Sequence, residues 1–256
     1  YNARNIARYS TDAGGLGVNF GFPIGETQRL NFGVLGEYTE ITQGFYSAQE
    51  IAEFIQKNGE NSANLKTNFS WTRSTLNRGV FATRGSSQSV SAEVSVPGST
   101  LQFYKFFFNA ERYFPLNREW SLRFRTEIGY GDGYGETPAL PFYEHFYAGG
   151  FGSIRGFETS TLGPRSTPPL DPEGNPIYFR DRDGEPFGGN FLFELSAELI
   201  FPMPFVEDNR QFRPVFFVDA GNVFNTKCPE VSVNCFGFER ENFRYSVGLG
   251  VSWLSG

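Results

Sequence analysis

The sequence predicts an all-β protein, part of an antiparallel transmembrane β-barrel with long extracellular loops. Apolar and polar residues alternate over nine segments, several of which reach the length of about 10 residues that a tilted strand needs to cross a bilayer. Aromatic residues recur near the segment ends, where membrane barrels carry aromatic girdles. The connections are largely short and long in turn, as in barrels whose hairpins emerge on opposite sides of a membrane. A soluble β-sandwich also alternates, but these three features favour the barrel.

Composition supports this fold class and excludes others. Of 256 residues, 39% are hydrophobic, yet the mean hydropathy is -0.36, so apolar residues are diluted by polar ones, as a period-two strand pattern requires. No run of 18 apolar residues predicts a transmembrane helix. A net charge of -6 argues against a nucleic-acid partner. We therefore expect residues 1–256 to form a single outer-membrane barrel domain in contact with the lipid bilayer.

The first five segments each set apolar residues against small or polar ones. In the first, Leu16, Val18 and Phe20 oppose Gly17 and Asn19. The next four repeat this pattern, although Phe107 interrupts the polar row of the fifth. These five segments span residues 15–22, 30–38, 65–71, 88–96 and 104–111. The tight Pro97-Gly98-Ser99 turn falls where a longer loop was allowed.

A short helix is predicted in the long connection after Tyr38. Ser47-Ala48-Gln49-Glu50 matches a capping box, with Ser47 as the N-cap. Ile51, Phe54 and Ile55 follow at helical spacing, and Gly59 is a helix stop. We expect this amphipathic helix to cover neighbouring loop or strand-end surface.

The last four segments carry charged residues on their polar side. In the sixth, Arg123, Arg125 and Glu127 alternate with apolar residues, and such a row cannot face lipid. Glu198 and Asp219 lie on the polar side of the seventh and eighth segments, so both should point inward. These four segments span residues 119–131, 191–202, 214–224 and 243–253.

A loop of residues 132–190 joins the sixth and seventh segments and carries the motif Ile154-Arg155-Gly156-Phe157 in a glycine-rich stretch. An inward pair of carboxylates needs a cation, and an arginine can pair and hydrogen-bond at once. We expect the loop to fold back so that Arg155 contacts Glu198 and Asp219. Arg123, Arg125 and Arg213 compete for this role, and an exposed loop arginine is the alternative reading.

The remaining reactive residues give little sign of chemistry. Cys228 and Cys235 lie in one predicted loop, either as a local disulfide or as two free thiols. We expect no metal, because His145 is the only histidine and Asp181-Arg182-Asp183-Gly184 lacks the spaced ligands of a calcium loop. No catalytic constellation is present, so we expect neither an enzyme nor a cofactor.

Several stretches are similar to one known family. The run Pro141–Gly150, the motif Ser153–Phe157 and Thr161–Pro164 resemble the sixth extracellular loop of the BamA family, the central subunits of the bacterial β-barrel assembly machinery. Further similarity lies in Leu76–Phe81, with Ala82 and Arg84 as departures, and around Glu198 and Asp219.

This resemblance implies a function as well as a fold. It implies an outer-membrane assembly factor that folds and inserts nascent outer-membrane proteins, working with accessory lipoproteins and periplasmic chaperones. It also implies that Arg155 contacts Glu198 and Asp219 inside the barrel. The nine segments would be about strands six to fourteen of roughly sixteen. The periplasmic POTRA domains, the first strands and the last two would then lie outside this sequence, which would supply barrel scaffold and a loop locked in the lumen.

Two alternatives remain open. A transport channel, of the porin or two-partner-secretion type, would share the barrel but keep an open lumen. A soluble or surface-binding β domain would stay monodisperse without detergent.

Overall fold

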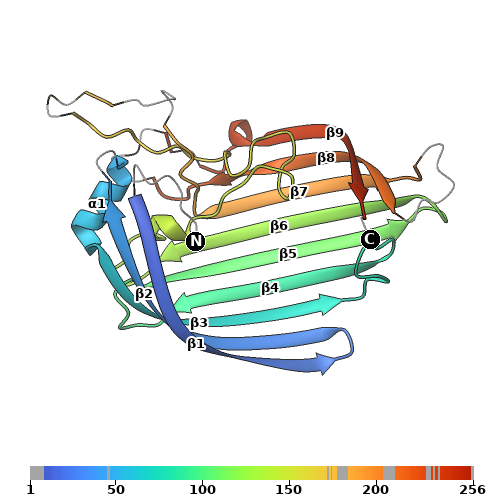
Figure 1. The fold of residues 1–256 in the computed structure, drawn as a ribbon, viewed down its shortest axis with the longest axis horizontal. Helices are drawn as coiled ribbons and strands as arrows, with labels where there is room; N and C mark the ends of the chain where they lie inside the picture. The colour runs from blue at the N-terminus through green and yellow to red at the C-terminus, as the bar shows by residue number, and fades with distance from the viewer. Residues whose placement is uncertain are drawn as a thin grey trace.

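The computed structural model describes residues 9–44, 47–171, 173, 175–177, 184–203, 211–228, 232, 234–235 and 237–254. Within these residues, nine strands form one antiparallel sheet and pair in sequence order (Figure 1). The all-β prediction of nine antiparallel strands is confirmed. The strands are β1 (Tyr9–Gly25), β2 (Gln28–Gln43), β3 (Asn61–Ser74), β4 (Gly85–Ser95), β5 (Phe103–Pro115), β6 (Ser121–Gly133), β7 (Phe191–Ile200), β8 (Phe212–Phe224) and β9 (Arg244–Trp253). One helix, α1 (Gln49–Asn58), and two short 3-10 helices, η1 (Phe142–Glu144) and η2 (Arg240–Asn242), complete the described elements.

Several strands are longer than the alternation predicts. β1 and β2 pair from Tyr9 and Gln43 down to Gly25 and Gln28, well beyond the predicted segments 15–22 and 30–38. The added ends are rich in threonine, serine and acidic residues, so they continue the hydrogen-bond ladder without an apolar outer row. Because alternation reports only the apolar band, it underestimates strands that extend past it.

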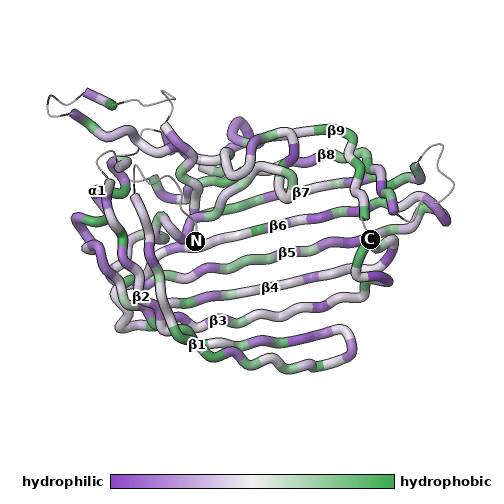
Figure 2. The backbone as a smooth tube through the Cα atoms, viewed as in Figure 1, coloured by the Kyte–Doolittle hydropathy of each residue, from purple (hydrophilic) through white to green (hydrophobic). Residues whose placement is uncertain are grey.

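The two faces of the sheet differ sharply in chemistry. Large apolar side chains are exposed on one face, which we name the outer face: Leu16 is 89% exposed and Leu249 74%. Polar side chains on the other face, the inner face, are buried: Asn64 is 3% exposed and Lys66 4%. Hydrophobic and hydrophilic positions alternate along the strands in Figure 2. This arrangement is the reverse of a soluble sheet, whose apolar side is buried.

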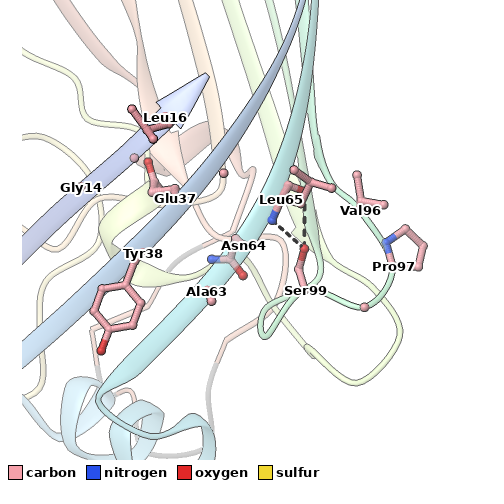
Figure 3. A pocket seen from close by; sticks show the side chains of 13 residues that line it. Gly14, Leu16, Glu37, Tyr38, Ala63, Asn64, Leu65, Val96, Pro97 and Ser99 are labelled. Atoms are coloured by element: carbon pink, nitrogen blue, oxygen red, sulfur yellow. Dashed lines mark hydrogen bonds between the residues drawn. The ribbon is translucent and has the colours of Figure 1, made fainter. Parts of the chain in front are cut away.

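Connection length separates the two ends of the sheet. The connections after β1, β3, β5 and β7 have at most 11 residues, whereas α1 and the described parts of the 134–190 and 225–243 connections gather at the other end, the long-loop end, where the seven-residue connection after β4 is the exception (Figure 1). At this end β3 extends beyond its pairing with β4, which stops at Lys66. The turn after β4 covers the unpaired edge of β3. Ser99 Oγ accepts from the N–H of Leu65 over 3.0 Å (Figure 3). Thr100 Oγ1 accepts from the N–H of Ala63 over 3.1 Å. The short Pro97-Gly98 turn therefore completes β3 in place of a longer loop.

Helix α1 forms where expected, but the predicted capping box is wrong. Ala48 is the N-cap and makes no side-chain cap hydrogen bond, while Ser47 Oγ donates to the carbonyl of Gly44 over 3.0 Å. Glu50 is engaged elsewhere, because its carboxylate accepts from Thr167 of the long loop. No described helix is long and apolar enough to span a membrane.

The apolar side of α1 covers the top of the inner face, as predicted for this helix. Ile51 is 2% exposed and packs in one cluster with Ile41 of β2 and Phe142 of η1. Phe54 meets the Phe142 ring edge to face at 5.3 Å. The helix thus holds the start of the long loop against the sheet.

Candidate functional site: the arginine of loop 134–190

Loop 134–190 folds over the inner face of the sheet. β6 continues to Gly133, so the loop begins two residues later than the predicted 132. Gly149 and Gly150 adopt φ values of 102° and 103°, a conformation that glycine reaches without steric cost, and turn the chain into the motif. The turn closes with a bridge between Ala148 and Leu162, which fixes both ends of the motif segment.

Arg155 lies against the two carboxylates that the sequence pairs with it. Its Nε donates to Asp219 Oδ2 and its Nη2 to Asp219 Oδ1, each over 2.7 Å. Its Nη1 donates to Glu198 Oε1 over 2.7 Å, and Nη2 also reaches Ser196 Oγ over 3.0 Å. The guanidinium stacks over the Phe217 ring at 3.7 Å. Four hydrogen bonds therefore hold the guanidinium, and its charge lies between the two carboxylates.

Because these charged side chains are buried, the loss of one of them should strongly lower stability. The Asp219 side chain is 0% exposed, that of Glu198 9% and that of Arg155 14%. A charge removed from water needs paired charge and hydrogen bonds, and removing one partner of a buried pair costs about 3–5 kcal/mol. Glu198 is also held from its other side, because Arg123 Nη1 donates to its Oε2 over 3.1 Å. Arg123, one of the competitors, thus shares Glu198 with Arg155.

The neighbours of Arg155 in the motif fix its position by packing. Ile154 is 0% exposed and lies in a cluster with Leu192 of β7 and Val223 of β8, against which Phe157 packs. Gly156 has a φ of 87°, which favours glycine. The apolar cluster therefore fixes the backbone of the motif, and this positions the guanidinium of Arg155 beside the carboxylates.

The remaining competitors have other partners. Arg125 donates to the carbonyls of Gly152 and Ser153, over 2.5 and 3.0 Å, and so grips the backbone that leads into the motif. Arg213 donates to the carbonyl of Ala82 over 2.7 Å, at the other end of the sheet. Sequence reasoning missed that Arg125 anchors the loop, because a backbone carbonyl leaves no trace in the sequence.

Two serines, one before the motif and one on β7, make further contacts that also went unpredicted. Ser153 Oγ donates to Glu194 of β7 and accepts the N–H of Gly149 over 2.8 Å. Ser196 Oγ donates to Asp219 Oδ1 over 2.7 Å. The signal was available, because Glu194 and Ser196 share the inward phase of Glu198.

A second ion cluster ties the beginning of the loop to the sheet. Glu144 receives Lys66 Nζ on one oxygen and Lys105 Nζ on the other, each over 2.8 Å. Lys66 also lies 2.5 Å from Glu37. Burial alone would raise the pKa of Glu144, but the charges of Lys105 and Lys66 outweigh it and hold that pKa below its ordinary value. Glu144 therefore stays ionised and bridges β3 and β5 to the loop.

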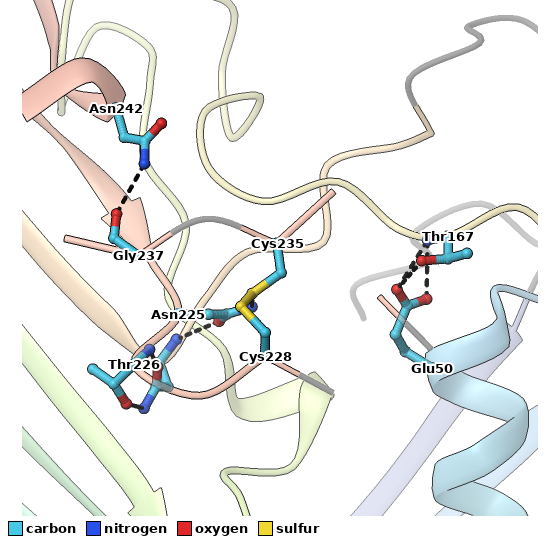
Figure 4. Close-up of a disulfide and its surroundings, with 9 residues drawn as sticks. Glu50, Thr167, Asn225, Thr226, Cys228, Cys235, Gly237 and Asn242 are labelled. Atoms are coloured by element: carbon cyan, nitrogen blue, oxygen red, sulfur yellow. Dashed lines mark hydrogen bonds between the residues drawn. A yellow bond between two sulfur atoms is a disulfide. The ribbon is translucent and has the colours of Figure 1, made fainter. Parts of the chain in front are cut away.

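Two further contacts join segments of the chain at the long-loop end. Cys228 and Cys235 form a disulfide with a Cα–Cα distance of 5.8 Å (Figure 4). Both Glu50 oxygens accept from the N–H of Thr167 over 3.0 Å, which ties α1 to a distant part of the loop (Figure 4). Burial raises the pKa of Glu50.

No group of three or more His, Cys, Asp or Glu side chains within the described ranges could hold a metal ion. Residues 181–183 of the stretch that was considered above as a calcium loop lie outside the described residues. The arrangement around Arg155 can hold a loop in place, because the two serine hydroxyls and the three carboxylates there are engaged with the motif segment or with one another.

Long antiparallel strands, exposed apolar side chains on one face and buried charges on the other define a class of protein, the membrane β-barrel, of which this sheet is a part. The chain belongs to the Omp85 superfamily, whose domain matches residues 1–256.

Individual relatives agree with this assignment. The outer membrane protein assembly factor BamA of Neisseria meningitidis serogroup B is 33% identical over 98% of this chain and 33% of its own length. A SAM50-like protein of Schizosaccharomyces pombe is 26% identical over 63% of this chain and 31% of its own. The chain thus spans about a third of the length of these curated relatives.

Solved structures show the same fold. The BamA structure of Haemophilus ducreyi lacking POTRA domains 1–3 superposes with a TM-score of 0.84, at 28% identity, over 96% of this chain and 49% of that one. CdiB from Acinetobacter baumannii superposes with a TM-score of 0.53 at 12% identity, over 96% of this chain and 37% of that one. The likeness to CdiB concerns the fold alone.

Proposed function

We propose that this chain is the barrel part of an outer-membrane protein assembly factor, a protein that folds and inserts β-barrel proteins into the bacterial outer membrane. Membership of the Omp85 superfamily and 33% identity to a BamA support this activity. In this proposal residues 1–256 form part of one barrel domain, in which the inner face lines the lumen and the outer face meets lipid. The long-loop end is extracellular, since outer-membrane barrels keep periplasmic turns short.

The observation that carries the proposal is the contact of Arg155 with Asp219 and Glu198. We infer that this contact locks loop 134–190 inside the lumen and so keeps β6, β7 and β8 in one register while client proteins are inserted elsewhere on the barrel. A loop held in this way narrows the lumen, which fits an assembly factor better than an open channel. The partners would be nascent outer-membrane proteins, accessory lipoproteins and periplasmic chaperones.

The disulfide fits the same placement. Disulfides persist in oxidising compartments such as the periplasm and the cell surface. Cys228 and Cys235 lie at the long-loop end, which this orientation puts outside the cell.

Assembly by the full-length protein, reconstituted with its accessory subunits in vesicles, tests the function. The assay follows a client barrel as it becomes resistant to protease. Arg155→Ala should lower the initial rate several-fold, because two buried carboxylates lose their cation. Arg155→Lys should fall between this variant and the wild type, since an ammonium keeps the charge but loses the planar fork.

The matched control is Arg118→Ala, which removes one arginine from an exposed turn and should leave the rate unchanged. If wild-type vesicles assemble no client but conduct ions as an open pore, the chain belongs to a transport channel. If Arg155→Ala and Arg118→Ala assemble clients equally well, the lock plays no part in the activity.

A further inference from the structure

The outer face of β4–β8 carries an arginine, Arg112, that takes no part in the contact of Arg155 with Asp219 and Glu198. Arg112 of β5 is exposed, and among the described residues it pairs with no carboxylate. Its guanidinium lies 4.6 Å from the centre of the Phe114 ring, two residues nearer the short-turn end. The neighbouring Glu111 faces inward, where its Oε2 accepts from Arg123 over 2.9 Å. Arg112 is therefore a cation on the lipid side of the sheet.

The register shows that Arg112 lies within the apolar band. Beyond it, the outer row formed by Phe114, Leu122, Leu199 and Phe216 runs across β5–β8. A charged residue on the lipid face of a barrel costs about 2–4 kcal/mol at the bilayer midplane and close to zero at the interface. Stacking on Phe114 directs the guanidinium toward the interface, as snorkelling arginines do. An anionic group at that level would compensate the charge.

A groove of about 500 Å³ lies beside Arg112 on the same face. Small side chains form its floor, since Ala110 pairs with Thr126 on β6 and Ala197 pairs with Val218 on β8. Its rim at β4 is polar, because Ser86 is the register partner of Arg112. A cation at one edge of an apolar channel matches an amphiphile with an anionic head and a hydrocarbon tail.

We propose that this groove binds one phospholipid of the periplasmic leaflet, with the phosphate on Arg112 and an acyl chain over Ala110, Thr126 and Ala197. A guanidinium binds phosphate oxygens through two parallel hydrogen bonds, which favours a phosphate over a neutral lipid head.

A second outer groove provides an internal comparison. It lies at the long-loop end, with a volume of about 750 Å³, between Leu16, Tyr38 and Leu65 (Figure 3). Its one charged lining residue, Glu37, has its carboxylate on Lys66. This groove is apolar without a free cation, so it offers no equivalent site for a phosphate.

Native mass spectrometry of the full-length protein, in detergent with added phosphatidylglycerol, tests the proposal. The wild type should retain one lipid more tightly than the background, and Arg112→Gln should weaken that binding about tenfold. Ala110→Leu fills the floor while keeping the arginine, and should weaken it as well. Arg73→Gln is the matched control, because Arg73 is exposed in the outward phase of β3 but does not line the groove.

Two further probes separate the parts of the ligand. Diacylglycerol, which has the tails without the phosphate, should bind no better to the wild type than to Arg112→Gln. Inorganic phosphate at millimolar concentration should not displace the lipid, because it lacks a tail; displacement would show a plain anion site instead. Equal lipid retention by the wild type, Arg112→Gln and Ala110→Leu would overturn the proposal.

This inference rests on the membrane placement of the proposed function but not on the assembly activity. If Arg112→Gln loses the lipid but assembles clients normally, the lipid site is supported independently of the assembly activity. Unaltered lipid retention in an Arg155→Ala protein that assembles poorly would separate the site from the lock.

Discussion

The guanidinium of Arg155 and the carboxylate of Asp219 meet side by side, through two hydrogen bonds of 2.7 Å each. The backbone N–H of Arg155 donates to Asp219 Oδ2 as well, over 3.1 Å. Asp219 therefore accepts three hydrogen bonds from one loop residue and fixes both its backbone and its side chain. Asp219 on β8 thus holds the motif segment together with the apolar cluster around Ile154.

Asp219→Asn tests this contact with little change of shape. The amide is neutral, and its NH₂ group would face the donors of Arg155. We expect the free energy of unfolding to fall by about 3 kcal/mol, as for other broken buried pairs. Heat-induced unfolding in detergent gives the stability, and limited proteolysis reports release of the loop. Asp12→Asn, on an exposed position of β1, is the control; equal behaviour of the two variants would show that the pair stabilises nothing.

Glu144→Gln tests the second ion cluster. The amide cannot compensate both Lys66 and Lys105, so we expect the free energy of unfolding to fall by about 2 kcal/mol, as for lost hydrogen bonds to charged groups. Hydrogen exchange should increase at residues 140–147, while the motif around Arg155 stays protected by its own anchor. Glu136→Gln changes an exposed carboxylate of the same loop and should leave exchange unchanged. Uniform loss of protection along the whole loop would show that the two anchors act as one.

The buried His145 should make the free energy of unfolding depend on pH. The pKa of His145 is lowered from 6.5 to about 4, chiefly by burial with a smaller contribution from the charge of Lys105, although the carbonyls of Phe187 and Leu140 and the charge of Glu144 act to raise it. Between these two pKa values the unfolded chain binds a proton that the folded chain excludes. Stability should therefore fall as the pH drops from about 6.5 to about 4, by at most about 3 kcal/mol, and this contribution should level off below.

The difference between wild type and His145→Gln isolates this effect, because His145 is the only histidine. Unfolding measured from pH 8 to pH 4 should show a shallower loss of stability in the variant. Parallel curves would show that His145 takes up its proton equally well in the folded protein.

The disulfide should stabilise the long-loop end locally. Cys228 and Cys235 close a short loop, for which loop-closure entropy gives about 2 kcal/mol. In the double variant Cys228→Ser, Cys235→Ser, exchange should rise within the 225–243 connection and remain low around Arg155. Reduction of the wild type with dithiothreitol should reproduce the same pattern. Loss of protection at Arg155 as well would show that the disulfide supports the lock.

Much of this architecture follows from the sequence for identifiable reasons. Alternation predicts the nine strands because the apolar outer row and the polar inner row have opposite surroundings. The same phase puts Glu198 and Asp219 on the inner face, where the structure brings Arg155 to them. The ends of β1 and β2 escaped prediction because threonine and acidic residues extend them beyond the apolar band.

Other contacts lie beyond pattern reasoning. Glu144 meets Lys66 across 78 positions of sequence, and nothing local selects that lysine over another. Arg125 binds the Gly152 and Ser153 carbonyls, which every residue possesses. Glu50 was assigned to a capping box by local spacing, whereas Thr167 of the long loop takes both its oxygens. Local rules failed where a distant segment supplied a better partner.

A cysteine cross-link measures the central claim most directly, because it reports whether the motif lies on the inner face. A Cβ added at Gly156 would lie 3.5 Å from that of Ser246 on β9, within the range of about 3.5–4.5 Å for disulfides. Because the φ of 87° strains any side chain at this position, Gly156→Ala is made alongside to measure how far that strain alone loosens the loop. The pair Gly156→Cys, Ser246→Cys is made in full-length protein lacking Cys228 and Cys235. Gly152→Cys with Ser246→Cys is the control, since a Cβ at Gly152 has no neighbour within 4 Å.

Non-reducing peptide mapping of protein from intact outer membranes gives the yield of each cross-link. We predict a high yield for the 156–246 pair, a low yield for the 152–246 pair, and a marked loss of the first when Arg155→Ala is added. No cross-link at 156–246, or a yield that Arg155→Ala leaves unchanged, would contradict the account.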